Sequence, residues 1–239
     1  MTSPTELAPG LTVQGVQPPL NLRDFKLIAF DMDSTLINIE CVDEIADAAG
    51  RKAEVAAITE AAMRGEITDY KDSLRRRVAL LKGVTEEHLA HVYRSRLRLN
   101  PGAAELVLAC KAAGLKVLLV SGGFTYFAER LRDRLALDFA RSNQLEIIDG
   151  QLTGRLLDQS WGDICDGAMK RETLLRTCSL IGCSPSQAIA MGDGANDLEM
   201  MGVAGLSVAY RAKPKVRAQA KVAIDMGGLD RLLELFKNA

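Results

Sequence analysis

Two pairs of carboxylates in this chain of 239 residues have the composition and spacing of a cation-binding site. Asp31 and Asp33 directly follow one short apolar run, and Asp193 and Asp197 follow another. Residues i and i+2 of an extended chain point to the same side, so these two carboxylates repel each other unless a proton or cation intervenes. A hard divalent ion with oxygen ligands, such as Mg2+, relieves that repulsion. Asp31 and Asp33 alone would equally suit a turn, but the second acidic pair favours a magnesium site.

Groups suited to an anion occur at two further positions. Ser121 ends a third apolar run and is followed by Gly122 and Gly123. A hydroxyl, exposed backbone N–H groups and a following helix favour phosphate, although the same tripeptide also serves as a turn with a serine helix cap. Lys170 begins a predicted helix, where the helix dipole disfavours a cation. It is therefore solvated, paired with Glu172 beside it, or held by an anion.

The elements that position these groups form an alternating pattern. Short apolar runs predict buried strands at 25–30, 116–120, 187–191, 206–210 and 221–224. Helical segments are predicted at 101–113, 124–135, 169–181, 197–201, 214–220 and 229–236. Strands that alternate with helices indicate an α/β fold with a Rossmann-like parallel sheet covered on both faces. Ligands bind such sheets just past the carboxyl ends of the strands, so the polar clusters should meet at one edge.

The remaining segments predict the domain organisation. Residues 40–99 lack strand signals and contain four predicted helices, at 41–49, 53–64, 68–81 and 86–94, which indicates an inserted helical cap. The core would then comprise 25–39 and 100–239, with a small hairpin at 145–154 around an Asp-Gly turn. Residues 1–24 contain four prolines and are expected to be a flexible arm, too short for a folded domain.

Composition excludes several classes of protein. The formal net charge is -1, and basic clusters lack interleaved aromatic residues, so no nucleic-acid partner is expected. Five cysteines without a CxxC pair argue against disulfides and zinc. No apolar segment is long enough to span a membrane, and the N-terminus lacks the pattern of a signal peptide, so we expect a cytoplasmic protein.

Four of these features occur in a familiar order. The run 31–35, Ser121, Lys170 and the run 192–197 resemble the four motifs of the haloacid dehalogenase superfamily of phosphatases. Residues 39–46, 73–78 and 120–124 further resemble its phosphoserine phosphatase branch. The resemblance covers roughly 25–237. It implies Mg2+-dependent hydrolysis of O-phosphoserine to serine and phosphate through an aspartyl-phosphate, a step in serine biosynthesis.

The resemblance also implies roles for the acidic residues. Asp31 would be the nucleophile that attacks phosphorus. Asp33 would protonate the leaving oxygen and then act as base for the hydrolytic water, and burial together with the charge of Asp31 should raise its pKa. Mg2+ would be held by the carboxylates of Asp31 and Asp193 and the backbone carbonyl of Asp33. Asp197 would orient a water molecule bound to the metal.

Phosphate binding would fall to the groups that suit an anion. The resemblance places Ser121 and Lys170 on the phosphoryl oxygens, assisted by the Gly122 N–H and by Asn196. Phosphoryl transfer depends mainly on positioning and charge neutralisation, so a metal ion and a lysine are the groups expected at such a site.

Selectivity would come from the cap. The resemblance places Glu40 on the substrate amino group and Arg77 on its carboxylate, which the planar guanidinium can bind with two hydrogen bonds. Met63 would supply an apolar wall. Glu40 also suits a first-turn helix acid, and Arg77 adjoins Arg75 and Arg76, so which arginine meets the substrate stays open at this point.

Other functions share much of this chemistry. A phosphatase for a sugar phosphate or nucleotide, or a phosphotransferase, would use Asp31 in the same way and differ in the cap residues and in access of water. A non-catalytic phosphate-binding protein is disfavoured, because the nucleophile and its charged neighbours are all present.

Overall fold

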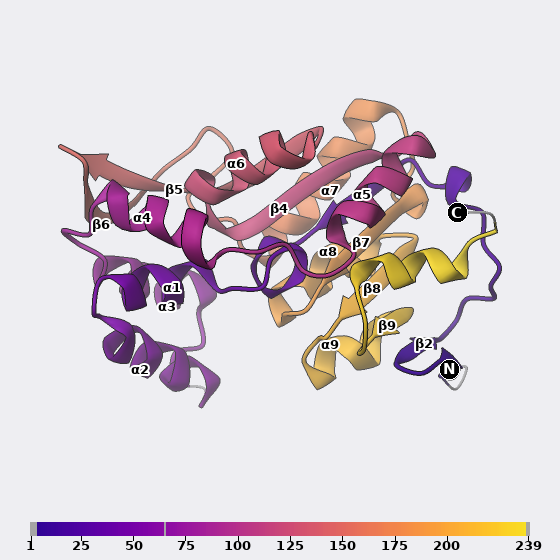
Figure 1. Ribbon diagram of the computed structural model, residues 1–239, viewed down its shortest axis with the longest axis horizontal. Helices are drawn as coiled ribbons and strands as arrows, with labels where there is room; N and C mark the ends of the chain where they lie inside the picture. Colours follow the sequence, from indigo (N-terminus) through magenta and orange to yellow (C-terminus); the bar gives the residue numbers. More distant parts are fainter. Residues whose placement is uncertain (1–3, 65, 238–239) are drawn as a thin grey trace.

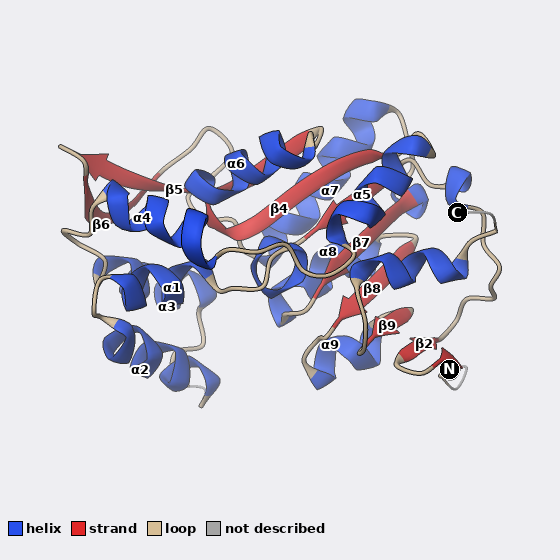
Figure 2. Ribbon diagram, in the orientation of Figure 1, coloured by secondary structure: helices blue, strands red, loops and turns tan. Residues whose placement is uncertain are grey.

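The computed structural model describes residues 4–64 and 66–237, which form one mixed sheet flanked by helices (Figures 1 and 2). The strands are β1 (Thr5–Ala8), β2 (Leu11–Val13), β3 (Leu27–Phe30), β4 (Lys116–Phe124), β5 (Phe139–Ile148), β6 (Gln151–Leu157), β7 (Ala188–Gly192), β8 (Leu206–Tyr210) and β9 (Val222–Ile224). In the described residues they lie in the order β1-β2-β9-β8-β7-β3-β4-β5-β6. The contiguous strands from β9 to β5 are parallel, which confirms the predicted α/β fold.

The parallel strands are apolar because helices cover both of their faces. Successive residues of β3 alternate between two clusters: Ile28 and Phe30 join one, Leu27 and Ala29 the other. The first cluster includes side chains of α5 (Ala103–Ala112) and α6 (Thr125–Leu135). The second includes side chains of α7 (Gly167–Ile181), α8 (Leu198–Val203) and α9 (Pro214–Gln219). This two-sided burial explains why strands 27–30, 188–192 and 206–210 read as continuous apolar runs.

A helical insertion lies between β3 and β4. It comprises α1 (Cys41–Ala48), α2 (Lys52–Met63), α3 (Tyr70–Ala79) and α4 (Glu86–His91), followed by a π-helical turn at Val92–Arg96. In Figure 1 these helices gather with the β5–β6 hairpin at one end of the molecule. The two connections to the core run side by side, because Ile37 pairs with Leu99 and the Asn100 side chain donates to the Thr35 and Ile37 carbonyls at 2.8 and 3.0 Å.

The N-terminal segment differs from the predicted flexible arm. In the described residues 4–24, β2 pairs antiparallel with β9, and Leu11 and Val13 are buried. The cause is the edge of the parallel strands, because the outer backbone groups of β9 would be unpaired without β2. The two alternating apolar side chains of β2 are enough to bury this short strand against the sheet. The prolines of this segment lie outside the two short strands.

The middle of the chain also departs from the prediction. β4 continues through Phe124, so residues 121–123 belong to a strand end rather than a turn. β5 begins at Phe139, where it pairs parallel with β4 before it turns into the hairpin with β6. The hairpin is therefore longer than the predicted 145–154. None of the helices in the described part of the chain has the length and apolar character to cross a membrane.

Candidate active site

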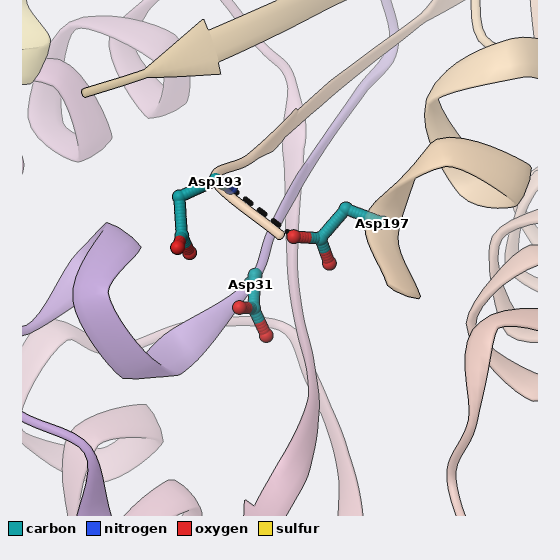
Figure 3. A group of neighbouring side chains, drawn as sticks. All are labelled: Asp31, Asp193 and Asp197. Carbon is teal, nitrogen blue, oxygen red and sulfur yellow. Dashed lines mark hydrogen bonds between the residues drawn. The ribbon is translucent and has the colours of Figure 1, made fainter. Parts of the chain in front are cut away.

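The acidic clusters meet where β3 and β7 end. Phe30 pairs with Met191 at the end of the two strands, and the Asp31 N–H donates to the Met191 carbonyl at 2.9 Å. One carboxylate oxygen each of Asp31, Asp193 and Asp197 lies within 4.8 Å of the others, and Figure 3 shows the three carboxylates close together. The parallel register therefore brings residues 162 positions apart (31 and 193) to one point of the sheet edge.

Lys170 neutralises part of this charge. It lies in the first turn of α7 and is fully buried, with Nζ 2.6 Å from Asp31 Oδ1 and 2.6 Å from Asp197 Oδ1. Glu172 instead pairs with Arg176. Two buried carboxylates thus hold Lys170 at the helix N-terminus, which is one of the three alternatives that its position in the sequence left open.

Asp197 organises the loop that carries Asp193. Its second oxygen, Oδ2, accepts hydrogen bonds from the N–H groups of Asp193 and Gly194 at 3.1 and 2.9 Å. Gly192 must lack a side chain, because a Cβ there would overlap the Asp197 carboxylate. Both carboxylate oxygens of Asp197 are thus engaged by other groups of the protein. The Thr35 hydroxyl donates to Asp193 Oδ1 at 3.0 Å and orients the remaining carboxylate.

The site carries more negative than positive charge. Burial raises the pKa of Asp31 well above its usual value, as does the charge of Asp197, while Lys170 opposes the rise. Burial, with the charges of Asp197 and Glu40, raises the pKa of Asp193 to about 6. Burial alone would lower the pKa of Lys170, but Asp197 and Asp31 raise it well above its usual value. Because one lysine faces several carboxylates, an added divalent cation fits the donor set.

Asp33 lies on a strained turn after β3. Ser34 has a φ of 56°, an unusual value for a side-chain-bearing residue, and its hydroxyl donates to Glu40 Oε1 at 2.7 Å. Asp33 Oδ2 accepts the Cys41 N–H at 3.3 Å, whereas Oδ1 is buried without a partner in the described residues. Burial and then the charge of Glu40 raise the pKa of Asp33 to about 7. The predicted rise is confirmed, although its electrostatic part comes from Glu40 rather than from Asp31.

A cavity of about 530 Å³ opens above these groups. Its walls include the following predicted site residues: Asp31, Asp33, Glu40, Arg77, Ser121, Gly122, Asp193 and Asn196. Lys170 and Asp197 lie beneath them. Arg77 is the only one of the three neighbouring arginines among the cavity-lining residues that the structure describes, since Arg75 pairs with Asp163 and Arg76 with Asp72. The side chain of Met63 lies outside the described part of the chain.

Several further residues line the cavity, and of these only Gly123 was singled out from the sequence as part of a candidate site. They are Val42, Asp43, Thr59, Ile67, Thr68, Asp69, Tyr70, Ser73, Leu74, Gly123, Phe124, Gly194, Ala195 and Lys213. Lys213 follows β8, so the rule that ligands bind beyond strand ends would have found it. Tyr70 packs its hydroxyl against Gly122, where any Cβ would overlap it. No pattern in the sequence signals this contact between the cap and the core.

Asn143 of β5 is a further supporting residue that the sequence did not reveal. It is fully buried, donates to the Gly122 carbonyl at 2.7 Å and accepts the Cys165 N–H at 2.7 Å. It therefore fixes the strand end that carries Ser121. The polar residues around Asn143 obscured this strand in the sequence. Asn143 itself supports Gly122, one of the phosphate-binding candidates.

Comparison with known proteins gives a consistent picture. Residues 25–205 match the model of the haloacid dehalogenase-like hydrolases. The chain is 75% identical over 234 residues to phosphoserine phosphatase of Polaromonas sp., covering 98% of this chain and 99% of the relative. It is 47% identical to that of Idiomarina loihiensis, covering 89% and 94% of the two chains.

Solved structures agree with these relatives. A phospho-aspartyl intermediate analogue of phosphoserine phosphatase superposes with a TM-score of 0.81 at 38% identity, covering 89% of this chain and 99% of the other. A substrate-bound phosphoserine phosphatase superposes with the same TM-score, identity and coverage.

Proposed function

This chain belongs to the haloacid dehalogenase-like hydrolases, and we propose that it hydrolyses O-phosphoserine to serine and inorganic phosphate. The observation that carries this proposal is the shared cavity, whose walls include both the acidic pair Asp31 and Asp33 and the pair Arg77 and Glu40. The first pair suits phosphoryl transfer, and the second matches the carboxylate and amino groups of an amino acid. Its relatives of 75% and 47% identity are phosphoserine phosphatases.

Asp31 is the proposed nucleophile. One of its carboxylate oxygens forms a bond to phosphorus as the bond between phosphorus and the serine oxygen breaks, which gives an aspartyl-phosphate and splits one difficult step into two. Lys170, 2.6 Å from Asp31 Oδ1, favours the ionised form of this buried carboxylate and offers positive charge to the transferred group.

Asp33 is the proposed acid and base. It gives its proton to the departing serine oxygen, then accepts a proton from the water that attacks phosphorus and releases phosphate from Asp31. A pKa of about 7 suits both roles near neutral pH. Its unpartnered Oδ1 is free to bind the leaving oxygen.

The phosphoryl oxygens are proposed to bind Lys170, the Ser121 hydroxyl, the Gly122 N–H and Asn196. Asn143 holds Gly122 from behind. Mg2+ would be held by the carboxylates of Asp31 and Asp193 with the backbone carbonyl of Asp33. Bound there, it would neutralise charge on the phosphoryl group.

The segment 40–99 is proposed as the unit that selects the substrate. Arg77 is only half-buried and makes a single long hydrogen bond within its own helix, so its guanidinium can take up a carboxylate. Glu40 is an exposed residue that lines the cavity near Asp33 and can accept an ammonium group. A cytoplasmic location remains a prediction from the sequence. The five cysteines are free thiols.

Phosphate release from a panel of phosphomonoesters, with and without Mg2+, tests the proposal. L-phosphoserine should lead the panel, activity should need Mg2+, and the Asp31→Asn variant should be inactive. A different leading ester with the same dependence on Mg2+ and Asp31 would keep the chemistry and reject the assignments of Glu40 and Arg77.

A further inference from the structure

Asp43 presents an unmatched carboxylate to the cavity. It lies in the first turn of α1, three residues after Glu40, and lines the same space. Its Oδ1 is buried, and no group in the described residues donates a hydrogen bond to it. Burial raises the pKa of Asp43, and the positive charge of Arg77 is the strongest opposing influence. A buried acceptor without a donor is rare in folded proteins and requires an explanation.

The guanidinium of Arg77 in α3 likewise has N–H donors without acceptors in the described residues. Its only hydrogen bond in the described residues runs from Nε to the Ser73 carbonyl of its own helix, at 3.4 Å. None of the carboxylates described lies within 4.0 Å of its guanidinium, whereas Arg75 and Arg76 each have one. A guanidinium offers five N–H donors in a planar fork, and a substrate carboxylate takes two of them. One edge of the fork therefore remains for a second carboxylate.

Glu40 is not the natural partner for that edge. It accepts the Ser34 hydroxyl at 2.7 Å, and its charge acts on Asp33 and Asp193 beside the reacting centre. The largest charge effect on the pKa of Asp43 is that of Arg77, ahead of those of Glu44 and Lys52. Glu40 and Asp43 thus act on different charged groups of the cavity.

We propose that Asp43 positions Arg77, binding the guanidinium edge that faces away from the substrate carboxylate; this inference rests on the proposed function. A long arginine side chain must give up rotational freedom when it binds a ligand. A carboxylate on the opposite edge of the fork offsets that loss, because it adds charge-assisted hydrogen bonds when the guanidinium turns to its binding orientation. Asp43 is accordingly a positioning residue, and its effect reaches the substrate only through Arg77.

Three substrates separate this role from direct contact with the substrate. Phosphoserine carries both groups, O-phosphoethanolamine lacks the carboxylate, and the deamino analogue of phosphoserine lacks the amine. Steady-state kinetics would be measured for the wild-type protein, Asp43→Asn and the double variant Asp43→Asn/Arg77→Ala. Asp72→Asn is the matched control, because it removes an exposed carboxylate of the cap that pairs with Arg76 outside the cavity.

Asp43→Asn should raise KM about tenfold for phosphoserine and for the deamino analogue, the size expected for one charge-assisted hydrogen bond. Its kcat should change less than twofold, phosphoethanolamine kinetics should be unchanged, and it should add nothing in the Arg77→Ala background. Kinetics equal to the wild type, or an equal loss with all three substrates, would overturn the inference, as would a loss confined to the two amines. Failure of the wild-type protein to hydrolyse phosphoserine would instead reject the proposed function.

Discussion

The edge of the sheet and the cap wall above it differ in how their charged side chains are partnered. At the sheet edge, Lys170 and Asp197 are fully buried and joined at 2.6 Å. On the cap wall, the side chains of Arg77 and Asp43 have no ion-pair or hydrogen-bond partner among the residues that the structure describes, beyond one long bond from Arg77 to a helix carbonyl. The charged groups at the sheet edge are therefore already paired before substrate binds. The cap groups proposed to recognise the amino acid gain partners only when substrate binds. Changes in the two regions should consequently have different effects on folding, kcat and KM.

The largest effect is expected at the sheet edge. Lys170→Met leaves the carboxylates of Asp31 and Asp197 buried without their cation, which should cost about 3–5 kcal/mol of unfolding free energy. It should also lower kcat by roughly a thousandfold, since a preorganised charge at the reacting oxygen is lost. Urea denaturation and steady-state kinetics measure the two effects.

Two further variants make this result interpretable. Lys71→Met removes a half-exposed lysine that pairs with Asp163 and Asp166 between cap and core, and should cost less than about 1 kcal/mol. Adding Asp197→Asn to Lys170→Met should restore part of the lost stability, because one uncompensated charge disappears. A stable, active Lys170→Met protein would contradict the buried network.

A smaller effect confined to substrate recognition is expected on the cap wall. Arg77→Ala should lower kcat/KM for phosphoserine about a hundredfold, the loss expected for two charge-assisted hydrogen bonds. Its thermal unfolding temperature should stay close to that of the wild type. Arg75→Ala, which removes an exposed partner of Asp163, is the control and should leave kcat/KM unchanged. Equal losses in both variants would mean that the cap contributes shape and not carboxylate recognition.

The smallest effect concerns pH. Asp193 has a pKa of about 6 in the folded protein, above the usual 3.8. The folded state therefore binds the proton more tightly, and this stabilisation is present below pH 4 and is lost as pH rises to about 6. Metal-free Asp193→Asn should thus gain stability over the wild type across that window, by at most about 3 kcal/mol at pH 7.

Divalent cation supplies the matching control for this pH effect. Mg2+ should stabilise the wild-type protein at pH 7 and remove the advantage of Asp193→Asn. Thermal unfolding at several pH values, with and without Mg2+, measures both. A difference between the two proteins that does not change with pH would contradict the raised pKa.

The same contrast explains what the sequence could predict. Asp31, Ser121 and Asp193 were found because parallel strands deliver whatever follows them to one edge, a rule that needs no tertiary detail. The partners of Lys170 were not, because they lie 139 and 27 residues away and depend on how α7 docks. Tyr70 was missed because its place follows from the orientation of the cap on the core.

The short strands β1 and β2 and the first half of β5 were missed for simpler physical reasons. β2 spans Leu11–Val13, too short for a recognisable pattern, and it forms because β9 offers an open edge. The first half of β5 is polar because Asn143 supports Gly122 rather than the apolar core. Next to the candidate phosphate site, a polar residue that supports the site thus stands where a buried strand would otherwise have an apolar residue.

Acid quenching of the reaction during turnover, followed by mass spectrometry of the peptides, tests the central claim most directly. With saturating phosphoserine and Mg2+, the peptide that contains Asp31 should carry one phosphoryl group, which hydroxylamine removes. Arg77→Ala should show the same modification at higher substrate concentration, because its chemistry is intact and only recognition is weakened. A phosphoryl group on another residue, or none at Asp31 while phosphate is being released, would contradict the account.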